Sequence, residues 1–304
     1  MSAAVDGSSR AGVLLHDEPM ARHTSWRVGG PADVFFKPAT LDELRAFLSS
    51  LDEGLPLHWI GFGSNLLVRD GGIRGVVICT SDLPKEPERV RERRVRAGAG
   101  VPCAILARRC VEWGIGPAAF FAGIPGTLGG ALAMNAGAFG GETWNDVVEV
   151  ETIDRRATVR FRNRSDYEIG YRSVRGAEHE WFLAASFALR ADAAEDRRAL
   201  TRLLRTRRAT QPIGRPSAGS VFRNPPSAHA GDLIEKAGLK GLAVGGATVS
   251  DKHANFIINT GNATARDIEE LIDLVRDKVH EAFGVELELE VRVLGEPALG
   301  ERRG

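Results

Sequence analysis

Apolar residues three and four positions apart predict amphipathic helices in several parts of the chain. One helix is expected to begin after Thr40, because Thr40 and Glu43 match the capping-box pattern, and to end at Gly54. The longest is expected to begin after Thr264 and end at Gly284, with a buried face formed by Ile268, Leu271, Ile272, Val275 and Val279. Further helices are expected over residues 104–113, 196–210 and 233–237.

Short apolar or alternating segments between these helices predict strands. They comprise residues 34–36, 57–60, 66–68, 76–79, 147–153, 158–162, 181–189, 243–249, 255–258 and 285–293. The last segment alternates strictly, so its valines and leucines share one face and Glu290 is expected on the polar face. On pattern alone, that polar face would be solvated. Strands and helices in this mixture indicate an α+β fold.

The order of the predicted elements divides the chain into three α+β domains after a short tail. Residues 1–12 are small and polar and are expected to form a flexible tail. Residues 13–82 and 83–210 are expected to form two subdomains, the second beginning in a charged interval. Residues 211–217 hold two prolines and a glycine and predict a hinge into a third domain, residues 211–304.

Net charge argues against a nucleic-acid-binding protein. The chain has 40 basic and 40 acidic residues, so it has no overall field that would attract nucleic acid or an anionic membrane. The basic helix predicted over residues 196–210 has no interleaved aromatic residues, which indicates a solvated face. No run approaches the roughly 18 apolar residues of a membrane span, so membrane insertion is not expected.

The cysteines and the first residues of the chain bear on its compartment. Cys79, Cys103 and Cys110 are odd in number and form no C-x-x-C pair, which disfavours a disulfide framework and indicates a reducing cytosol. The first residues lack the apolar core of a signal peptide. No cluster of His, Cys, Asp and Glu has metal-ligand spacing, so no metal is expected.

Two glycine-rich segments are candidates for binding a diphosphate. Residues 123–142 contain too many glycines for an ordinary helix or strand, and are too apolar for a linker. Successive N–H groups in such a loop form a concave anion site. Residues 61–65 follow a predicted strand and give a weaker signal, since a tight turn would look the same. They lack the third glycine and the distant acidic residue of a nicotinamide-binding Rossmann fold, which is therefore disfavoured.

Taken together, these two segments resemble the FAD-binding loops of the vanillyl-alcohol-oxidase-type flavoproteins. Within that superfamily the chain is most similar to the UDP-N-acetylenolpyruvoylglucosamine reductase family, in its short form, because residues 192–212 lack the insertion of another subtype. Further similar motifs lie at residues 23–33, 216–225, 249–259 and 289–295. The resemblance extends from about His16 to Gly295.

This resemblance implies a two-domain FAD-binding unit with a C-terminal substrate-binding domain. It implies that NADPH reduces FAD and leaves, and that UDP-N-acetylenolpyruvoylglucosamine then enters the same site and is reduced to UDP-N-acetylmuramate for peptidoglycan synthesis. A cytoplasmic monomer is expected. The residues that the resemblance assigns to FAD are Gly61, Phe62, Gly63, Ser64, Asn65, Gly123, Ile124, Pro125, Gly126, Thr127, Gly130, Asn135, Ala136 and Gly137.

The same resemblance implies three catalytic residues. Ser220, which pattern alone would make a turn serine, would donate a proton to C2 after flavin N5 delivers hydride to C3 of the enolpyruvyl group. Arg172 would hold the substrate carboxylate, and Glu290 would be the third catalytic group. Two positions depart from the family pattern: Val174 replaces a frequent serine, and Arg223 replaces a lysine. The expected substrate-binding residues are Tyr171, Arg223 and Asn224.

Two other functions remain open at the level of sequence. One is a different FAD-dependent oxidoreductase of the same fold, which would fail to be reoxidised by the enolpyruvyl sugar nucleotide. The other is a non-catalytic nucleotide-binding protein, which would be colourless even after FAD is added.

Overall fold

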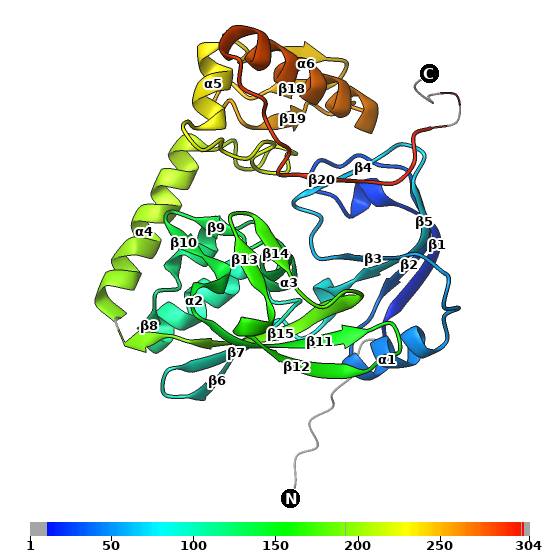
Figure 1. Ribbon diagram of the computed structural model, residues 1–304, viewed down its shortest axis with the longest axis vertical. Helices are drawn as coiled ribbons and strands as arrows, with labels where there is room; N and C mark the ends of the chain where they lie inside the picture. Colours follow the sequence, from blue (N-terminus) through cyan, green and yellow to red (C-terminus); the bar gives the residue numbers. More distant parts are fainter. Residues whose placement is uncertain (1–10, 192, 299, 301–304) are drawn as a thin grey trace, which may run out of the picture.

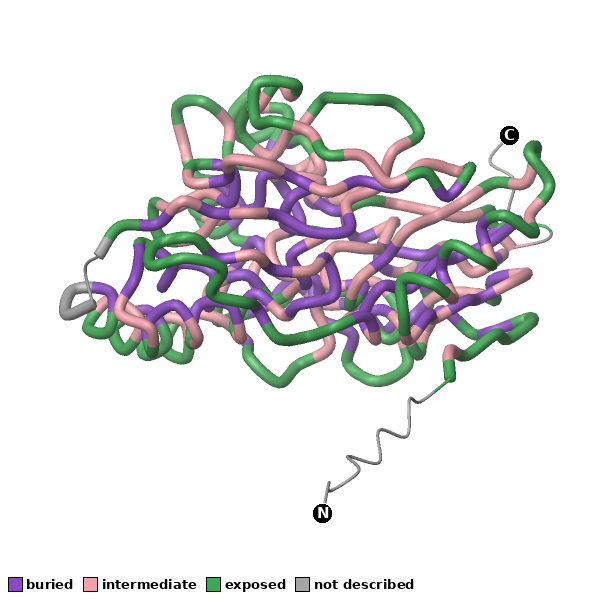
Figure 2. The backbone as a smooth tube through the Cα atoms, turned by 90° about the horizontal axis from the view of Figure 1, so that it is seen from below, coloured by how far each residue is buried: buried purple, intermediate pink, exposed green. Residues whose placement is uncertain are grey.

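The chain folds into three α+β units whose inner edges meet (Figure 1). The computed structural model describes residues 11–191, 193–298 and 300. Most of the predicted flexible tail, residues 1–10, lies outside the described residues. Buried backbone runs through the middle of the molecule, and the exposed stretches lie mainly in the outer loops (Figure 2).

The first unit is built on a four-stranded sheet in the order β1-β2-β5-β3. Its strands are β1 (Val13–Pro19), β2 (Pro31–Lys37), β5 (Ile73–Cys79) and β3 (Leu57–Ile60). Only the β1–β2 pair is antiparallel. The predicted capping box of Thr40 and Glu43 is confirmed at the start of α1 (Leu41–Ser49), but the expected end at Gly54 is wrong, because Ser50 is already the C-cap.

The second unit is built on an antiparallel five-stranded sheet in the order β12-β11-β15-β7-β6. Its strands are β12 (Val159–Asn163), β11 (Val147–Asp154), β15 (Glu180–Ala188), β7 (Arg94–Gly98) and β6 (Glu88–Arg91). Val150, Ala185 and Ala97 lie opposite one another across three strands, and each is about 1% exposed. This buried row packs in one core with α2 (Cys103–Trp113), so a helix covers this face of the sheet.

One long helix and several short elements complete the second unit. The long helix α4 (Ala193–Thr210) runs along one side of the molecule towards the third unit (Figure 1). The two-stranded pairs are β8 (Ile115–Gly116) with β16 (Arg190–Ala191), β9 (Gly137–Ala138) with β10 (Gly141–Glu142), and β13 (Glu168–Gly170) with β14 (Ser173–Arg175). The 3₁₀ helices in the described part of the chain are η1 (Met20–Arg22), η2 (Thr80–Asp82), η3 (Ala119–Gly123), η4 (Thr143–Asn145) and η5 (Arg164–Asp166).

The glycine-rich segment contains a helix, contrary to the expectation that it would form neither regular structure. Helix α3 (Leu128–Ala133) lies inside it. A Cβ added to Gly129 would come within 2.9 Å of the Ala99 Cβ, so the helix packs closely on the neighbouring backbone because Gly129 lacks a side chain. Buried Leu128 and Leu132 then anchor α3 in the core of the second unit.

The third unit packs helices α5 (Ala230–Lys236) and α6 (Ala265–Phe283) against a small sheet. The capping box at Thr264, the end at Gly284 and the predicted buried face of α6 are confirmed. The single strand expected over residues 243–249 is wrong. It is divided into β17 (Ala243–Val244) and β18 (Ala247–Val249) by a turn at Gly245, whose φ is +51°, and β18 then pairs with β19 (Ile257–Asn259).

The strand expected over residues 285–293 is also wrong in its extent. Only β20 (Arg292–Leu294) is regular, and it pairs in parallel with β4 (Leu66–Val68) of the first unit. The preceding residues lie beside the irregular segment 220–223, so single hydrogen bonds such as Glu290 N to Val221 O (2.8 Å) replace a continuous ladder. The alternation did predict correctly that Leu287 and Val291 are buried.

Trp26 joins the first unit to the third. Its side chain is fully buried among residues of the third unit. Its Nε1 donates to the Ile257 carbonyl (2.7 Å), and Asn259 Nδ2 donates to the Trp26 carbonyl (2.9 Å). The motif at residues 23–33 therefore holds two units together.

Replacing Trp26 with alanine is expected to lower the free energy of unfolding by about 3–5 kcal/mol, because a large buried ring is lost. Trp26→Phe keeps most of the ring but leaves the Ile257 carbonyl unpaired, so a smaller loss of about 1–3 kcal/mol is expected. Urea unfolding measures both. Phe161→Ala, at an exposed position, is the control. If Trp26→Ala lowered the free energy of unfolding no more than Phe161→Ala does, Trp26 would not hold the first and third units together.

Candidate active site

A cavity of about 770 Å³ lies where the three units meet. Its walls come from the β3–β4 loop, the glycine-rich segment, the end of α4, residues 211–220 and the segment before β20. The predicted site residues that line it are Gly61, Phe62, Gly63, Ser64, Asn65, Gly123, Ile124, Pro125, Gly126, Thr127, Gly130, Ala136, Gly137, Arg172, Ser220 and Glu290. Segments far apart in sequence thus meet at one site.

Two glycines of the β3–β4 loop lie too close to neighbouring segments to carry a side chain. A Cβ on Gly61 would lie 2.2 Å from Thr127 Oγ1. Gly63 has φ +60°, and a Cβ there would lie 2.0 Å from the His23 carbonyl oxygen. Gly130 faces open space within the cavity wall. Gly61, Gly63 and Gly130 therefore present backbone without side chains to the cavity, and together they form a glycine cradle.

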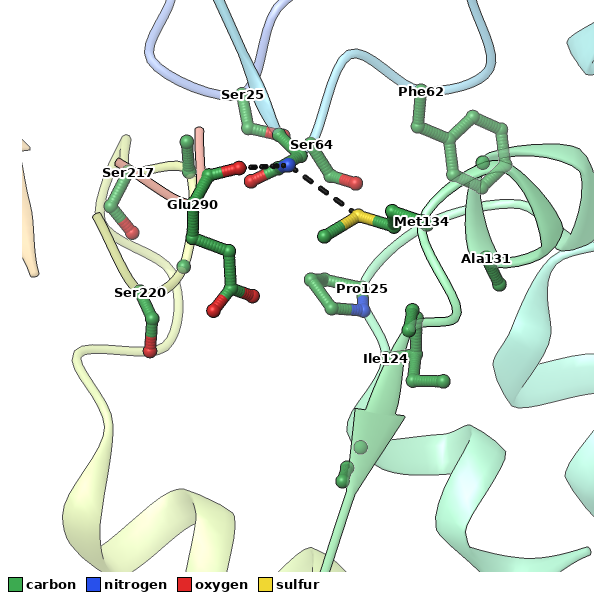
Figure 3. A pocket seen from close by; sticks show the side chains of 18 of the residues that line it. Ser25, Phe62, Ser64, Ile124, Pro125, Ala131, Met134, Ser217, Ser220 and Glu290 are labelled. Carbon is green, nitrogen blue, oxygen red and sulfur yellow. Dashed lines mark hydrogen bonds between the residues drawn. The ribbon is translucent and has the colours of Figure 1, made fainter. Parts of the chain in front are cut away.

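Asn65 connects this cradle to the segment that contains Glu290. Its Nδ2 donates to the Glu290 carbonyl (3.0 Å) and to Met134 Sδ (3.4 Å); the two acceptor residues are labelled in Figure 3, where dashed lines mark these bonds. Its own carbonyl accepts from Arg292 N (3.0 Å). The predicted cofactor residue Asn65 therefore also fixes the backbone of a predicted catalytic residue.

Asn135 does not line the cavity, although it was expected to contact the cofactor. It is fully buried, with φ +46°. Its Nδ2 donates to Glu142 Oε2 (3.0 Å) and the Gly170 carbonyl (3.1 Å), while its Oδ1 accepts from Trp144 N (3.1 Å). Its amide is thus engaged inside the protein, where it joins the glycine-rich segment to the hairpin that contains Arg172.

Arg172 is held in place by three acceptors. Its Nε donates to Glu290 Oε1 (3.0 Å), Nη2 to the Gly137 carbonyl (2.9 Å) and Nη1 to the Asn135 carbonyl (3.4 Å). The backbone of Arg172 has φ +53°, a strained conformation that is often found at functional sites. A guanidinium has five N–H groups, so one remains on each Nη atom for a bidentate anion.

Glu290 lies in the cavity wall, not on the solvated face that the strand pattern alone favoured. The Glu290 side chain is 13% exposed. Burial raises its pKa above that of an ordinary glutamate, although the neighbouring Arg172 and Arg223 oppose that rise. The Glu290 carboxyl therefore stays protonated up to a higher pH than an ordinary glutamate does.

Ser220 lies on a segment that is tightly fixed to the third unit. Val221 N donates to the Asn255 carbonyl (2.9 Å), and the Asn255 side chain bonds both Phe222 N (2.9 Å) and the Phe222 carbonyl (2.8 Å). Ser217, Ser220 and Glu290 lie along one wall, and Ile124 and Pro125 face them from the other (Figure 3). Ser220 is thus placed beside Glu290 by backbone hydrogen bonds.

The three predicted substrate-binding residues do not line the cavity. Tyr171 is 48% exposed, and the Arg172 guanidinium lies 5.2 Å from its ring centre. Arg223 Nη2 donates to the Arg172 carbonyl (3.4 Å), and its buried Nε has no hydrogen-bond partner among the described residues. Asn224 Oδ1 accepts from Ala230 N (3.0 Å) at the start of α5. Their role in binding substrate stays a prediction.

The charged side chains of the cavity favour anionic ligands. Four arginines line it, Arg172, Arg207, Arg215 and Arg292, against one carboxylate, Glu290, among the described lining residues. Sequence reasoning did not select Arg207, Arg215 or Arg292. Arg207 precedes the predicted hinge and Arg215 lies within it, and the hinge was the only signal that could have pointed to them.

The residues present fit FAD. Trp59 Nε1 and Thr127 Oγ1, both on lining residues, are buried without a hydrogen-bond partner in the described chain. The glycine cradle leaves room for a diphosphate, and the arginines supply positive charge.

Within residues 11–191, 193–298 and 300, no group of three or more His, Cys, Asp or Glu could hold a metal ion. No helix in the same part of the chain has both the length and the apolar character needed to cross a membrane.

Comparison with known proteins agrees with this geometry. Residues 32–161 match the FAD binding domain family, and residues 211–294 match the family described as UDP-N-acetylenolpyruvoylglucosamine reductase, C-terminal domain. The chain is 56% identical to the UDP-N-acetylenolpyruvoylglucosamine reductase of Alkalilimnicola ehrlichii, over 96% of this chain and 98% of the relative. The corresponding protein of Methylococcus capsulatus is 55% identical, over 97% of each chain.

A solved structure of the reductase from Thermus caldophilus has the same fold. It superposes with a TM-score of 0.78 at 31% identity, covering 93% of this chain and 99% of the other. The resemblance that the motifs predicted is therefore confirmed over nearly the whole length. The chain belongs to the UDP-N-acetylenolpyruvoylglucosamine reductase family.

Proposed function

We propose that this chain is an FAD-dependent oxidoreductase that uses NADPH to reduce UDP-N-acetylenolpyruvoylglucosamine to UDP-N-acetylmuramate in peptidoglycan synthesis. The main support is the arrangement of Arg172, Ser220 and Glu290 around one cavity beside two glycine-rich backbones. Bound FAD supplies hydride transfer, which no amino-acid side chain can provide. The arginine-rich lining suits two successive anionic nucleotides, NADPH and the UDP-sugar, in a shared site.

Arg172 is proposed to hold the substrate carboxylate. Its two free N–H groups lie on separate Nη atoms and match the two carboxylate oxygens. Negative charge that develops on this carboxylate during hydride transfer is stabilised by the same guanidinium. Because protein acceptors already fix the arginine, little reorganisation is needed when substrate binds.

Ser220 is proposed as the donor of the proton that completes the reduction. A serine hydroxyl is a weak acid, so its contribution depends on its position against a strongly basic carbon centre. The rigid segment around Val221 and Phe222 supplies that position. Glu290, in its neutral form, is proposed to assist from the adjacent wall by donating a hydrogen bond.

An anaerobic sequence of flavin spectra tests this function. The purified protein should be yellow, lose its colour with NADPH, and regain it when UDP-N-acetylenolpyruvoylglucosamine is added. If another oxidant but not this sugar nucleotide restores the colour, the chain is a different oxidoreductase of the same fold. A protein that stays colourless in the presence of FAD contradicts any flavoenzyme.

We also propose that the enzyme is a monomer in the cytoplasm, where NADPH and UDP-sugars are found. The buried free thiols Cys79, Cys103 and Cys110 agree with a reducing compartment. Light scattering after gel filtration measures the mass in solution, and fractionation of cells that express the tagged chain measures its location.

Replacing Asn135 tests whether its side chain positions Arg172 or contacts the cofactor. Asn135→Asp keeps the shape and the tolerance for positive φ, but it cannot donate to the Gly170 carbonyl and it repels Glu142. We expect a loss of about 1–3 kcal/mol in the free energy of unfolding and slower reoxidation by substrate, since Arg172 is displaced. FAD retention should stay near that of the wild type.

The exposed Asn145→Asp provides the matched control for this change. Stopped-flow absorbance measures each half of the cycle, and the flavin-to-protein ratio measures retention. Loss of FAD from Asn135→Asp with normal reoxidation would mean that the Asn135 side chain acts on the cofactor instead.

A further inference from the structure

Arg207 is a half-buried cation in the cavity wall, and its hydrogen-bond partners in the described chain are neutral. It lies in the last turn of α4 and lines the cavity. Its Nε donates to Gln211 Oε1 (3.1 Å) and its Nη1 to the Ala122 carbonyl (3.0 Å). Within the described chain no carboxylate forms an ion pair with it. Burial lowers the pKa of Arg207, and no acidic neighbour offsets that effect.

The unused donors of Arg207 are available to a ligand. A guanidinium has five N–H groups and stays charged in proteins. Two of the Arg207 groups are occupied, which leaves three without a hydrogen-bond partner among the described residues. Withdrawing a charge even partly from water costs free energy unless the charge is paired. The other cationic side chains of the cavity repel Arg207, and Glu290 is already paired with Arg172.

Its contacts place Arg207 at the beginning of the glycine-rich segment. Ala122 is the residue directly before Gly123, and both belong to η3. The guanidinium therefore lies at the start of the segment that also contains Thr127, whose buried Oγ1 has no hydrogen-bond partner among the described residues. An anionic group of the ligand bound along this segment would complete the pairing of Arg207.

We propose that Arg207 binds a negatively charged oxygen of FAD. This inference rests on the FAD site but not on the choice of substrate. Two parts of the cofactor offer such an oxygen: the diphosphate, and the pyrimidine edge of the reduced ring system, where nearby protein charge tunes the electronics of the flavin. A diphosphate contact strengthens binding of the oxidised cofactor, whereas a contact with the ring edge favours the reduced form.

The test compares Arg207→Gln with Arg207→Lys in the purified holoenzyme. Glutamine removes the charge, and lysine keeps it but cannot reproduce both protein hydrogen bonds. FAD retention is measured from the flavin-to-protein ratio after repeated ultrafiltration, and the reduction potential from equilibrium with a reference dye. The control is Arg205→Gln, on the exposed part of the same helix.

A diphosphate contact predicts about tenfold to a hundredfold weaker FAD retention in Arg207→Gln, the usual range for a lost hydrogen bond to a charged group. A ring-edge contact predicts normal retention and a reduction equilibrium about tenfold less favourable, equivalent to about −30 mV for two electrons. In either case the FAD retention or reduction potential of Arg207→Lys should lie closer to the wild-type value than that of Arg207→Gln.

Three results would overturn the proposal. The first is no change in retention or potential. The second is a lysine variant as impaired as the glutamine variant, which would indicate a purely structural role at the helix end. The third is an effect confined to the KM of NADPH or of the sugar nucleotide. Neither main readout uses the sugar nucleotide, so failure of the proposed substrate would leave this test intact.

Discussion

Replacing Ser220 with alanine should leave NADPH able to bleach the bound flavin while the sugar nucleotide no longer restores its colour. Hydride transfer from NADPH needs no proton from Ser220, so the first half of the cycle should proceed at nearly the wild-type rate. The second half loses its positioned acid, and reoxidation should slow by about 10²–10⁴-fold, the usual contribution of a general acid. Anaerobic stopped-flow absorbance separates the two rate constants.

Ser227→Ala is a suitable control, because Ser227 is an exposed serine in the same domain. Both of its half-reactions should match the wild type. Unfolding curves for both variants should also coincide with the wild type, since no hydrogen bond that fixes the backbone of segment 220–223 uses the Ser220 hydroxyl. Reoxidation of Ser220→Ala at a normal rate would remove Ser220 from the mechanism.

Local chemistry explains which elements could be predicted from the sequence. The capping boxes at Thr40 and Thr264 and the buried face of α6 depend on residues within a few positions of one another. The strand predicted over residues 285–293 failed because its pairing depends on segments distant in the chain. The alternation of apolar and polar side chains reports burial, but it does not determine whether a regular hydrogen-bonding partner lies alongside.

The same limit applies to the site. Periodicity placed Glu290 on the polar face, but its partner Arg172 is 118 residues away, and only the fold brings them within 3.0 Å. The helix with Arg207 was expected to be solvated, and its composition gave no sign that its last turn enters a cavity. The glycine motifs did predict which segments meet. Close packing leaves no room for a side chain at positions 61 and 63, so the need for glycine there is visible in the sequence.

Replacing Arg172 with methionine is expected to slow reoxidation by about 10²–10³-fold, the usual effect of removing a donor that stabilises developing negative charge. Methionine has similar length and suits a partly buried position, so the loss should report charge and hydrogen bonding more than packing. The KM for the sugar nucleotide should also rise, because the proposed carboxylate contact disappears. The exposed Arg175→Met, on the same hairpin, is the matched control.

The pH dependence of this variant tests the pairing with Glu290. Burial raises the pKa of Glu290 and Arg172 lowers it, so Arg172→Met leaves burial opposed only by Arg223 and the pKa should rise further. If neutral Glu290 is the active form, reoxidation is fast below that pKa and falls as pH rises through it. The fall should move to higher pH in Arg172→Met and disappear in Glu290→Gln, whose side chain is always neutral. A Glu290→Gln profile that keeps the wild-type fall would assign the ionisation to another group and leave the Arg172–Glu290 pair a structural contact.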